Sequence, residues 1–472
     1  MPARLHRPFA VILVAFAAAA SAKAFSADAS AERPPNFIII FCDDLGYGDL
    51  GCFGSENIRT PNVDRMAKEG MRLTSFYSTS GVCSPSRSSL MTGCYPRRVN
   101  LHCNDSKLCV LFPADRKGLH PDEVTIADAL KPAGYATMCV GKWHLGDQPQ
   151  FLPTQQGFDS YFGIPYSNDM GRKNIPLPLL RDEKVIVAPV AQETLTGRYT
   201  EEVVRFIEAN KDRPFFLYLP HTFPHVPLFA AEPFRGKSPG GKYGDAVEEI
   251  DWSTGKILAA LKRLGLDRQT LVVFTSDNGA AGGSNAPLQG RKGSTDEGGM
   301  RVPCIVRWPG RVAAGTECDA LTVTFDLLPT LAKLAGVELS ADRTIDGRDI
   351  APLLLGHEDA KSPHEAFYYY QVDQLQAVRS GRWKLHLPLE NKRRNWGKPL
   401  GKTPLKLFDL QADIHENDDV SAEHPEVVKR LTELAEQARL DLGDEAVKGA
   451  GQRKAGWVDQ AVPQLLTETP GR

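Results

Sequence analysis

The sequence lacks strong charge of one sign, a long apolar segment beyond its N-terminal region, an internal repeat and any Cys-x-x-Cys pair. Its 472 residues carry a formal net charge of −2, so no overall positive field would attract nucleic acid. The nine cysteines show none of the clustered Cys/His spacings that hold zinc. Hydrophobic residues at 42% and charged residues at 24% are typical of a globular protein, and the length is sufficient for a large core and two domains.

The N-terminus has the pattern of a secretory signal peptide, which we predict over residues 1–24. Arg4 and Arg7 form a basic start, and the apolar stretch over residues 9–20 is too short to span a bilayer as a mature helix. Ala22-Lys23-Ala24 is one of two small-x-small cleavage sites. We therefore expect an exported protein without a membrane span in the mature chain. It would be periplasmic or extracellular, or lysosomal if the source is eukaryotic; an uncleaved anchor is the alternative.

Short apolar runs alternate with stretches of helical periodicity, which favours an α/β fold. We predict buried strands over residues 37–41, 137–140, 215–219 and 271–274. Polar residues follow each run at once: Asp43 and Asp44, Lys142 and His144, His221 and His225, and Asp277 and Asn278. Because ligands of open α/β sheets bind beyond the carboxyl ends of the strands, we expect these residues to form one site.

The composition changes near residues 356–363, where we predict a domain boundary. Residues 33–360 would form the catalytic domain. Residues 361–443 contain short strand-and-turn patterns and an amphipathic helix stripe, which predict a smaller C-terminal α+β domain with an antiparallel sheet. Residues 444–472 are polar with few apolar anchors and are predicted to be a loosely structured tail.

The most specific motif is Cys83-Ser84-Pro85-Ser86-Arg87-Ser88-Ser89-Leu90-Met91-Thr92-Gly93. Pro85 suits the first turn of a helix, and a helix N-terminus attracts anions such as sulfate. The short pattern alone is also compatible with an ordinary buried cysteine beside a capped helix. The full run, however, closely resembles the modification signature of the type I sulfatases. Gly163-Ile164-Pro165-Tyr166-Ser167-Asn168-Asp169 resembles the branch with arylsulfatase A and N-acetylgalactosamine-6-sulfatase.

This resemblance implies an alkaline-phosphatase-like fold, a large mixed sheet flanked by helices. It further implies that a formylglycine-generating or sulfatase-maturating enzyme oxidises Cys83 to formylglycine, whose hydrate is the catalytic nucleophile. Arg87, Lys142 and Lys292 would then neutralise charge on the sulfate oxygens.

Two acidic motifs predict a metal site. Asp43-Asp44 and Asp277-Asn278 offer only oxygen ligands, which hard cations such as Ca²⁺ and Mg²⁺ prefer. Each pair alone is more often a turn or a helix cap, which Asp and Asn both favour. Both motifs are similar to the metal motifs of the sulfatases. That resemblance implies one Ca²⁺ per chain, held by Asp43, Asp44, Asp277 and Asn278, which also contacts residue 83.

Two histidine motifs complete the predicted site. Gly141-Lys142-Trp143-His144 resembles a family segment whose lysine binds sulfate and whose histidine contacts formylglycine. Pro224-His225-Val226-Pro227 resembles a motif whose histidine faces the leaving oxygen. His221 is an alternative, but His225 keeps the Pro-His-x-Pro frame. By the same resemblance, Ser167 would support His144.

The sequence therefore predicts an exported sulfatase that hydrolyses sulfate esters, with a sulfated sugar or glycan as natural substrate. Two alternatives remain open. One is a phosphonate or phosphodiester hydrolase on the same fold, and the other is a non-catalytic protein that binds sulfated glycans. Lys392-Arg393-Arg394-Asn395-Trp396-Gly397-Lys398 is either a substrate-binding segment, since guanidinium groups suit sulfate, or a solvated surface loop.

Overall fold

The computed structural model describes Met1, residues 33–396 and residues 398–466. The predicted signal peptide lies almost wholly outside these residues. None of the helices in the described part of the chain is long and apolar enough to cross a membrane. All nine cysteines are free.

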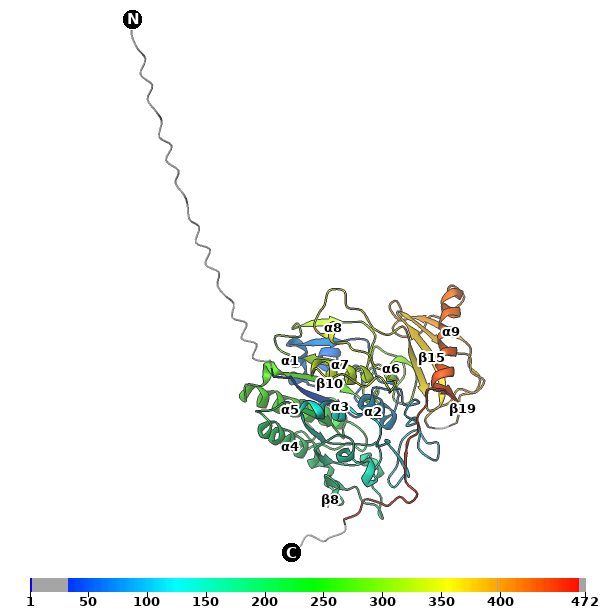
Figure 1. Cartoon of the computed structure of the whole chain (residues 1–472). Coiled ribbons are helices and arrows are strands. Elements are labelled where there is room, and N and C mark those ends of the chain that lie inside the picture. The colour runs from blue at the N-terminus through cyan, green and yellow to red at the C-terminus, as the bar shows by residue number, and fades with distance from the viewer. Residues whose placement is uncertain (2–32, 397, 467–472) are drawn as a thin grey trace. The chain divides into compact units, whose positions relative to one another are not determined.

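A large mixed sheet of ten strands organises most of the chain (Figure 1). Its order is β12 (Thr316–Cys318), β2 (Met71–Leu73), β11 (Cys304–Arg307), β10 (Thr270–Ser276), β1 (Asn36–Cys42), β9 (Phe215–Pro220), β5 (Ala136–Val140), β6 (Ser160–Gly163), β7 (Leu179–Arg181) and β8 (Lys184–Val187). The five strands from β10 to β6 are parallel neighbours, whereas β11, β7 and β8 are antiparallel to the strands beside them. The four strands predicted from the sequence are β1, β5, β9 and β10, and this confirms the predicted fold class.

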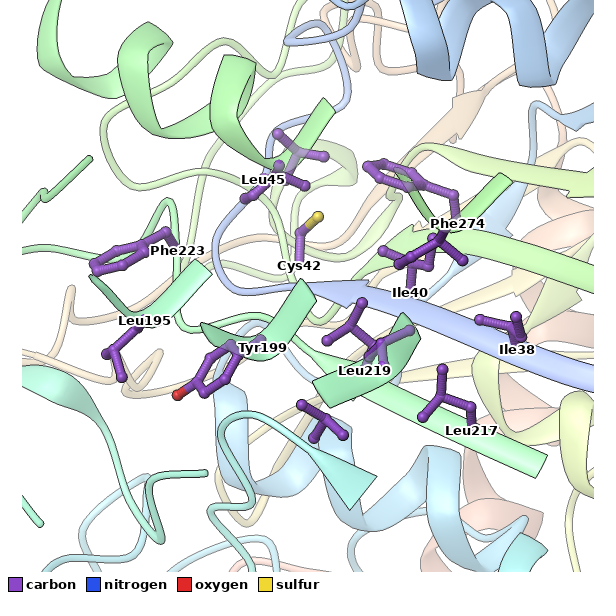
Figure 2. Close-up of a cluster of buried hydrophobic side chains, with 14 of the residues drawn as sticks. Ile38, Ile40, Cys42, Leu45, Leu195, Tyr199, Leu217, Leu219, Phe223 and Phe274 are labelled. Atoms are coloured by element: carbon purple, nitrogen blue, oxygen red, sulfur yellow. The ribbon is translucent and has the colours of Figure 1, made fainter. Parts of the chain in front are cut away.

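Both faces of the sheet are covered, which explains why its central strands are continuous apolar runs. Successive side chains of β1 alternate between two cores: Ile38 and Ile40 lie in one, and Phe37 and Ile39 in the other. Figure 2 shows the first of these cores, in which Ile38 and Ile40 pack near Leu217 of β9.

Each core is closed by its own set of helices. The first core contains apolar side chains of α1 (Pro61–Lys68), α4 (Leu195–Ala209) and α5 (Gly241–Arg263). The second contains side chains of α2 (Cys83–Thr92), α3 (Ile126–Leu130), α7 (Leu327–Leu334) and α8 (Ala351–Leu354). The sheet is therefore held between two helical layers.

The C-terminal part of the chain adds a small antiparallel sheet of four strands, in the order β14 (Phe367–Gln371), β15 (Gln374–Ser380), β16 (Trp383–His386) and β17 (Lys406–Asp409). Helix α9 (Pro425–Leu442) packs on it through the predicted apolar stripe, and both belong to a third core. Short strand pairs join β3 (Phe76–Tyr77) to β13 (Thr322–Val323) and β18 (Gly443–Asp444) to β19 (Val447–Lys448).

The segment after α9 makes several contacts with the rest of the chain. β20 (Gly456–Trp457) pairs with β4 (Lys117–Gly118). Arg453 Nε donates to Glu123 Oε1 at 2.8 Å. Contacts of this kind join distant parts of the chain and leave no periodic apolar pattern in the sequence. For this reason the sequence of this segment indicated a loose tail. The limits of the predicted domains, at residues 33, 360, 443 and 472, stay predictions.

Candidate active site

Polar residues follow the central parallel strands and meet at one edge of the sheet. β10, β1, β9 and β5 lie side by side in that order, so their carboxyl ends share this edge. Backbone hydrogen bonds extend the sheet beyond the strands, from Asp277 N to Cys42 O at 3.0 Å and from Lys142 N to Pro220 O at 2.8 Å. Gly141 permits the second approach, because a Cβ there would lie 1.9 Å from Pro220 O.

Cys83 is the first residue of α2 and is only 2% exposed. Pro85 lies in the first turn of that helix, as predicted. Burial raises the pKa of the Cys83 thiol well above its usual value, and the nearby Asp43 carboxylate raises it further. Since the thiolate is the nucleophilic form of cysteine, an unmodified Cys83 would be a poor nucleophile in this site.

Asp43 links Cys83 to the buried cations. The Cys83 thiol donates to Asp43 Oδ1 at 3.3 Å, and Lys142 Nζ donates to Asp43 Oδ2. Arg87 Nη2 lies 3.5 Å from Asp43 Oδ1 and 2.8 Å from Asp277 Oδ2. Burial acts to raise the pKa of Asp43, but Lys142 and the other nearby basic groups together outweigh it and hold that pKa well below the ordinary value. Asp43 is thus ionised, whereas burial, assisted by Asp43, raises the pKa of Asp277 to about 7.

Asp44 is the second carboxylate of the site and, with Asp43, Cys83, Lys142 and Lys292, forms a polar cluster. Lys292 Nζ lies 2.7 Å from its carboxylate, and Asn278 Nδ2 donates to Asp44 Oδ1 at 2.7 Å. The Asp44 N–H donates to Asp277 Oδ1 at 3.0 Å. Lys292 Nζ also lies 3.6 Å from Cys83 Sγ. Burial works against the Lys292 charge, yet Asp44 raises the pKa of this lysine above its ordinary value.

His225 faces this cluster. Its Nε2 lies 3.8 Å from Asp44 Oδ2, while its Nδ1 lies 3.1 Å from Asn168 Oδ1 and 2.5 Å from Val226 O. Since both neighbours of Nδ1 are acceptors, Nδ1 carries the hydrogen and Nε2 is the ring atom turned to the site. Burial and then Lys292 lower the pKa of His225.

The two other histidines of the predicted site, His144 and His221, are more deeply buried than His225. His144 Nε2 donates to Leu111 O at 2.9 Å, and its Nδ1 has no hydrogen-bond partner among the described residues. Ser167, predicted beside His144, instead accepts a hydrogen bond from Lys142 Nζ at 3.1 Å. His221 is fully buried, and neither ring nitrogen has a partner within the described chain. Burial lowers its pKa to about 3.

The donors of this cluster fit a hard divalent cation. Asp43, Asp44, Cys83 and His225 each bring one ligand atom within 4.8 Å of the others. Asn278 Oδ1 is buried and has no hydrogen-bond partner in the described part of the chain. Oxygen donors from carboxylates and amides are the ligands that such a cation prefers. Asp277 lies outside the group of ligand atoms within 4.8 Å but hydrogen-bonds the Asp44 backbone.

A cavity of about 710 Å³ opens next to these residues. Asp44, His225 and Lys292 line one part of it, and residues 392–396 of the C-terminal part line another. A substrate in this cavity would contact both the polar cluster and residues 392–396.

Comparisons with known proteins agree with this geometry. A family model described as Sulfatase matches residues 35–337. The chain belongs to the sulfatase family. A second model, described as N-sulphoglucosamine sulphohydrolase, C-terminal, matches residues 292–441 of this sulfatase.

Named relatives of this sulfatase align over most of its length. It is 38% identical to arylsulfatase A of Homo sapiens, with 87% of this chain and 89% of that protein covered. It is 43% identical to N-acetylgalactosamine-6-sulfatase of Canis lupus familiaris, with 76% and 72% covered. The crystal structure of Ps i-CgsB in complex with k-i-k-neocarrahexaose superposes with a TM-score of 0.75 at 31% identity, covering 86% of this chain and 92% of that chain. The protein is therefore a sulfuric ester hydrolase with an alkaline-phosphatase-like fold, which confirms the predicted family and enzyme class.

The sequence interpretation missed one residue of this sulfatase that contacts the cluster. Asn168 stands in a motif that was assigned to the family, but it received no role. It hydrogen-bonds His225 and also donates from Nδ2 to Pro227 O at 3.1 Å. Asn168 follows β6, the parallel strand next to β5, so extending the strand-end argument to this fifth strand would have found it.

Proposed function

We propose that this sulfatase is exported, depends on Ca²⁺ and acts on a sulfated carbohydrate through a formylglycine made from Cys83. The observation that carries the proposal is the convergence of Asp43, Lys142 and Lys292 on a buried Cys83 at the N-terminus of α2. Anionic oxygens and positive charges in a water-poor site are what transfer of a sulfuryl group requires.

Two absent groups would complete the site. A hydrated formylglycine at position 83 would supply one hydroxyl as nucleophile and a second hydroxyl whose deprotonation expels sulfate, which a serine lacks. Ca²⁺ held by Asp43, Asp44, Asp277 and Asn278 would supply positive charge beside the sulfate oxygens.

The buried basic residues Lys142, Lys292 and Arg87 have two different roles. Lys142 and Lys292 end in ammonium groups that contact Asp43 and Asp44, so both reach the position next to residue 83 where sulfate oxygens would lie. Arg87 is fully buried, and its Nη1 and Nη2 donate to Lys142 O and Asp277 Oδ2, each at 2.8 Å. We therefore assign Arg87 to orienting the acidic cluster and the two lysines to binding sulfate.

The histidines supply proton transfer. His225 turns Nε2 toward Asp44 and the cavity. In its imidazolium form, with a hydrogen on each ring nitrogen, His225 would pass the Nε2 proton to the leaving alcohol oxygen and return to the neutral Nδ1–H form. His144 has its Nε2 committed to Leu111 O, which leaves Nδ1 as the atom that would take the proton from the second hydroxyl at position 83.

A carbohydrate substrate is supported by two comparisons. The chain resembles an N-acetylgalactosamine-6-sulfatase and the structure of a protein bound to k-i-k-neocarrahexaose. The cavity of about 710 Å³ also has room for a sugar ring beside the sulfate.

The test is release of inorganic sulfate by protein made with a competent maturation system. The panel contains 4-nitrophenyl sulfate, sulfated monosaccharides, a phosphonate monoester and a phosphodiester, and Cys83→Ala is the control. We expect turnover of the sulfate esters, with the highest kcat/KM for a sugar, and none by Cys83→Ala. Preferential turnover of the phosphorus esters would reject the proposal in favour of the alternative hydrolase.

A further inference from the structure

The basic segment, residues Lys392–Trp396, forms part of the wall of the catalytic cavity. Lys392, Arg394 and Trp396 line the same cavity as His225 and Lys292. The segment is therefore a neighbour of the reacting groups, although about a hundred residues separate it from Lys292 in the chain. This position favours the substrate-binding interpretation over that of a solvated loop.

The backbone of the basic segment is tied to the small sheet. The Arg393 N–H donates to Gln374 Oε1 at 2.9 Å, and Gln376 Nε2 donates to Arg393 O at 3.0 Å. The Arg393 guanidinium pairs with Asp373, which lies just before β15. Arg393 thus holds the segment in place, and its charge is paired with Asp373.

Trp396 lies against the loop that carries Lys292. A Cβ on Gly293 would lie 2.6 Å from Trp396 Cζ3, so the indole is in contact with that backbone. Lys292 Nζ is 5.8 Å from the centroid of the indole ring. Trp396 nevertheless remains 53% exposed, which leaves an apolar surface at the cavity beside the sulfate-binding lysine. An aromatic face in this place suits a sugar ring.

Lys392 and Arg394 are two basic residues in the wall of the cavity. Within the described residues neither takes part in a salt bridge, in contrast to Lys292 and Arg393, which both do. Asp169 and Asp296 also line the cavity, but neither is paired with these two cations. Two unpaired cations at one wall of an anion-binding cavity indicate a ligand with more than one negative charge.

We propose that Lys392 and Arg394 form a subsite for a second acidic group of the substrate. The preferred substrate is then a sugar sulfate that also bears another sulfate or a carboxylate, with its ring on Trp396 and its scissile sulfate at residue 83. This inference rests on the proposed function, since it assigns chemistry to the same cavity.

The experiment measures competitive inhibition of 4-nitrophenyl sulfate hydrolysis by matched sugars. These are N-acetylgalactosamine and N-acetylglucosamine derivatives with one sulfate, with two sulfates, and with one sulfate plus a linked uronic acid. The wild-type enzyme should bind the doubly acidic sugars about tenfold or more tightly than the singly acidic ones, as one charge-assisted contact provides. Comparison of the disulfated sugars with the sugars that carry one sulfate and a uronic acid shows whether the second acidic group is a sulfate or a carboxylate.

The double variant Lys392→Gln/Arg394→Gln should remove this preference. Lys398→Gln is the matched control, because Lys398 belongs to the same basic run but does not line the cavity. It should keep the wild-type preference. Trp396→Ala should instead weaken the binding of singly and doubly acidic sugars by the same factor, since it removes the contact with the sugar ring. The preference should also fall as the salt concentration rises past about 0.1 M, where charges are screened beyond about 10 Å.

The outcomes separate the two proposals. Absence of sulfate release from every sulfate ester of the panel would reject the proposed function and this inference with it. Turnover with equal inhibition by singly and doubly acidic sugars would overturn the inference alone. A preference that survives unchanged in the double variant would also overturn it.

Discussion

Lys384 Nζ donates a hydrogen bond to Glu297 Oε1 at 3.0 Å, and neither side chain is exposed to solvent. Lys384 belongs to β16 of the small sheet, whereas Glu297 begins α6 (Glu297–Met300), just after the loop that carries Lys292. Lys384 also pairs with Glu416 at 2.8 Å. Burial acts to raise the pKa of Glu297, but Lys384 together with Arg379 and Arg301 outweighs it and keeps that pKa below the ordinary value. This pair connects the small sheet to one wall of the active site.

Loss of Lys384 should strongly destabilise the protein. Lys384→Met leaves Glu297 and Glu416 buried without their shared cation, which should cost about 3–5 kcal/mol of unfolding free energy. Urea unfolding of the variant and the wild type measures this loss of unfolding free energy. Lys402→Met removes an exposed partner of Glu390 and should cost less than about 1 kcal/mol. The double variant Glu297→Gln/Lys384→Met should lose less than the sum of the single variants; strict additivity would show that the two side chains are not coupled.

Residue 83 should be formylglycine in active preparations. The buried Cys83 thiol has a raised pKa, so an unmodified cysteine should contribute little nucleophilic attack. Mass spectrometry of the peptide that contains Cys83 and Arg87 should detect the aldehyde or its hydrate. Across preparations, kcat should rise in proportion to the fraction of residue 83 that is formylglycine. Full activity in a preparation whose Cys83 is entirely an intact thiol would exclude the mechanism.

The purified protein should contain one Ca²⁺ per chain. Asn278 Oδ1 is buried without a partner beside Asp44, and oxygen donors favour Ca²⁺. Chelation should lower the Tm, and added Ca²⁺ should restore it in the wild type but not in Asp44→Ala, because a bound ligand stabilises only the state that binds it. Elemental analysis gives the stoichiometry. Stoichiometric zinc, with a Tm that depends on zinc, would contradict the assignment.

His225, not His221, should protonate the leaving group. His225 faces Asp44 in the cavity, whereas His221 is fully buried and does not line it. The loss of kcat/KM in His225→Ala should be about 10²-fold or more for a sugar sulfate and smaller for 4-nitrophenyl sulfate, whose leaving group needs less protonation. His221→Ala is the comparison and should lose activity equally on both substrates. If only His221→Ala discriminates between leaving groups, the assignment is reversed.

Glu249 in α5 should make the free energy of unfolding fall as the pH rises from 4.5 to about 7. It is 1% exposed, its Oε2 accepts from Ala231 N at 2.9 Å, and burial raises its pKa from 4.5 to about 7. The folded state therefore binds this proton more tightly than the unfolded state. The resulting stabilisation is complete below pH 4.5 and is lost as the pH rises to about 7, a difference of about 3 kcal/mol.

Glu249→Gln mimics the protonated side chain and should remove this pH dependence. Urea unfolding should show the variant more stable than the wild type at pH 8 by up to about 3 kcal/mol and equal to it near pH 4.5. Subtracting the two proteins cancels the other titrating groups. A constant difference across this range would show that Glu249 has an ordinary pKa.

Much of the site could be predicted because it depends on local patterns. Continuous apolar runs specify strands buried on both faces, and the first polar residues after such strands must emerge at the sheet edge. Asp43, Lys142 and Asp277 were found in this way, and motif order supplied the family. The start of α2 near Pro85 followed from local helix chemistry alone.

The sequence by itself determined the fold class, the family and the set of residues at the strand ends. Tertiary structure decided which of these side chains touch each other. Ser167 contacts Lys142, Asn168 orients His225, and Lys384 reaches Glu297. These contacts join residues that are 25, 57 and 87 positions apart, and they depend on rotamers and on how one sheet packs beside another. No periodicity in a single sequence encodes those directions, because each is settled only when distant segments bury their surfaces together.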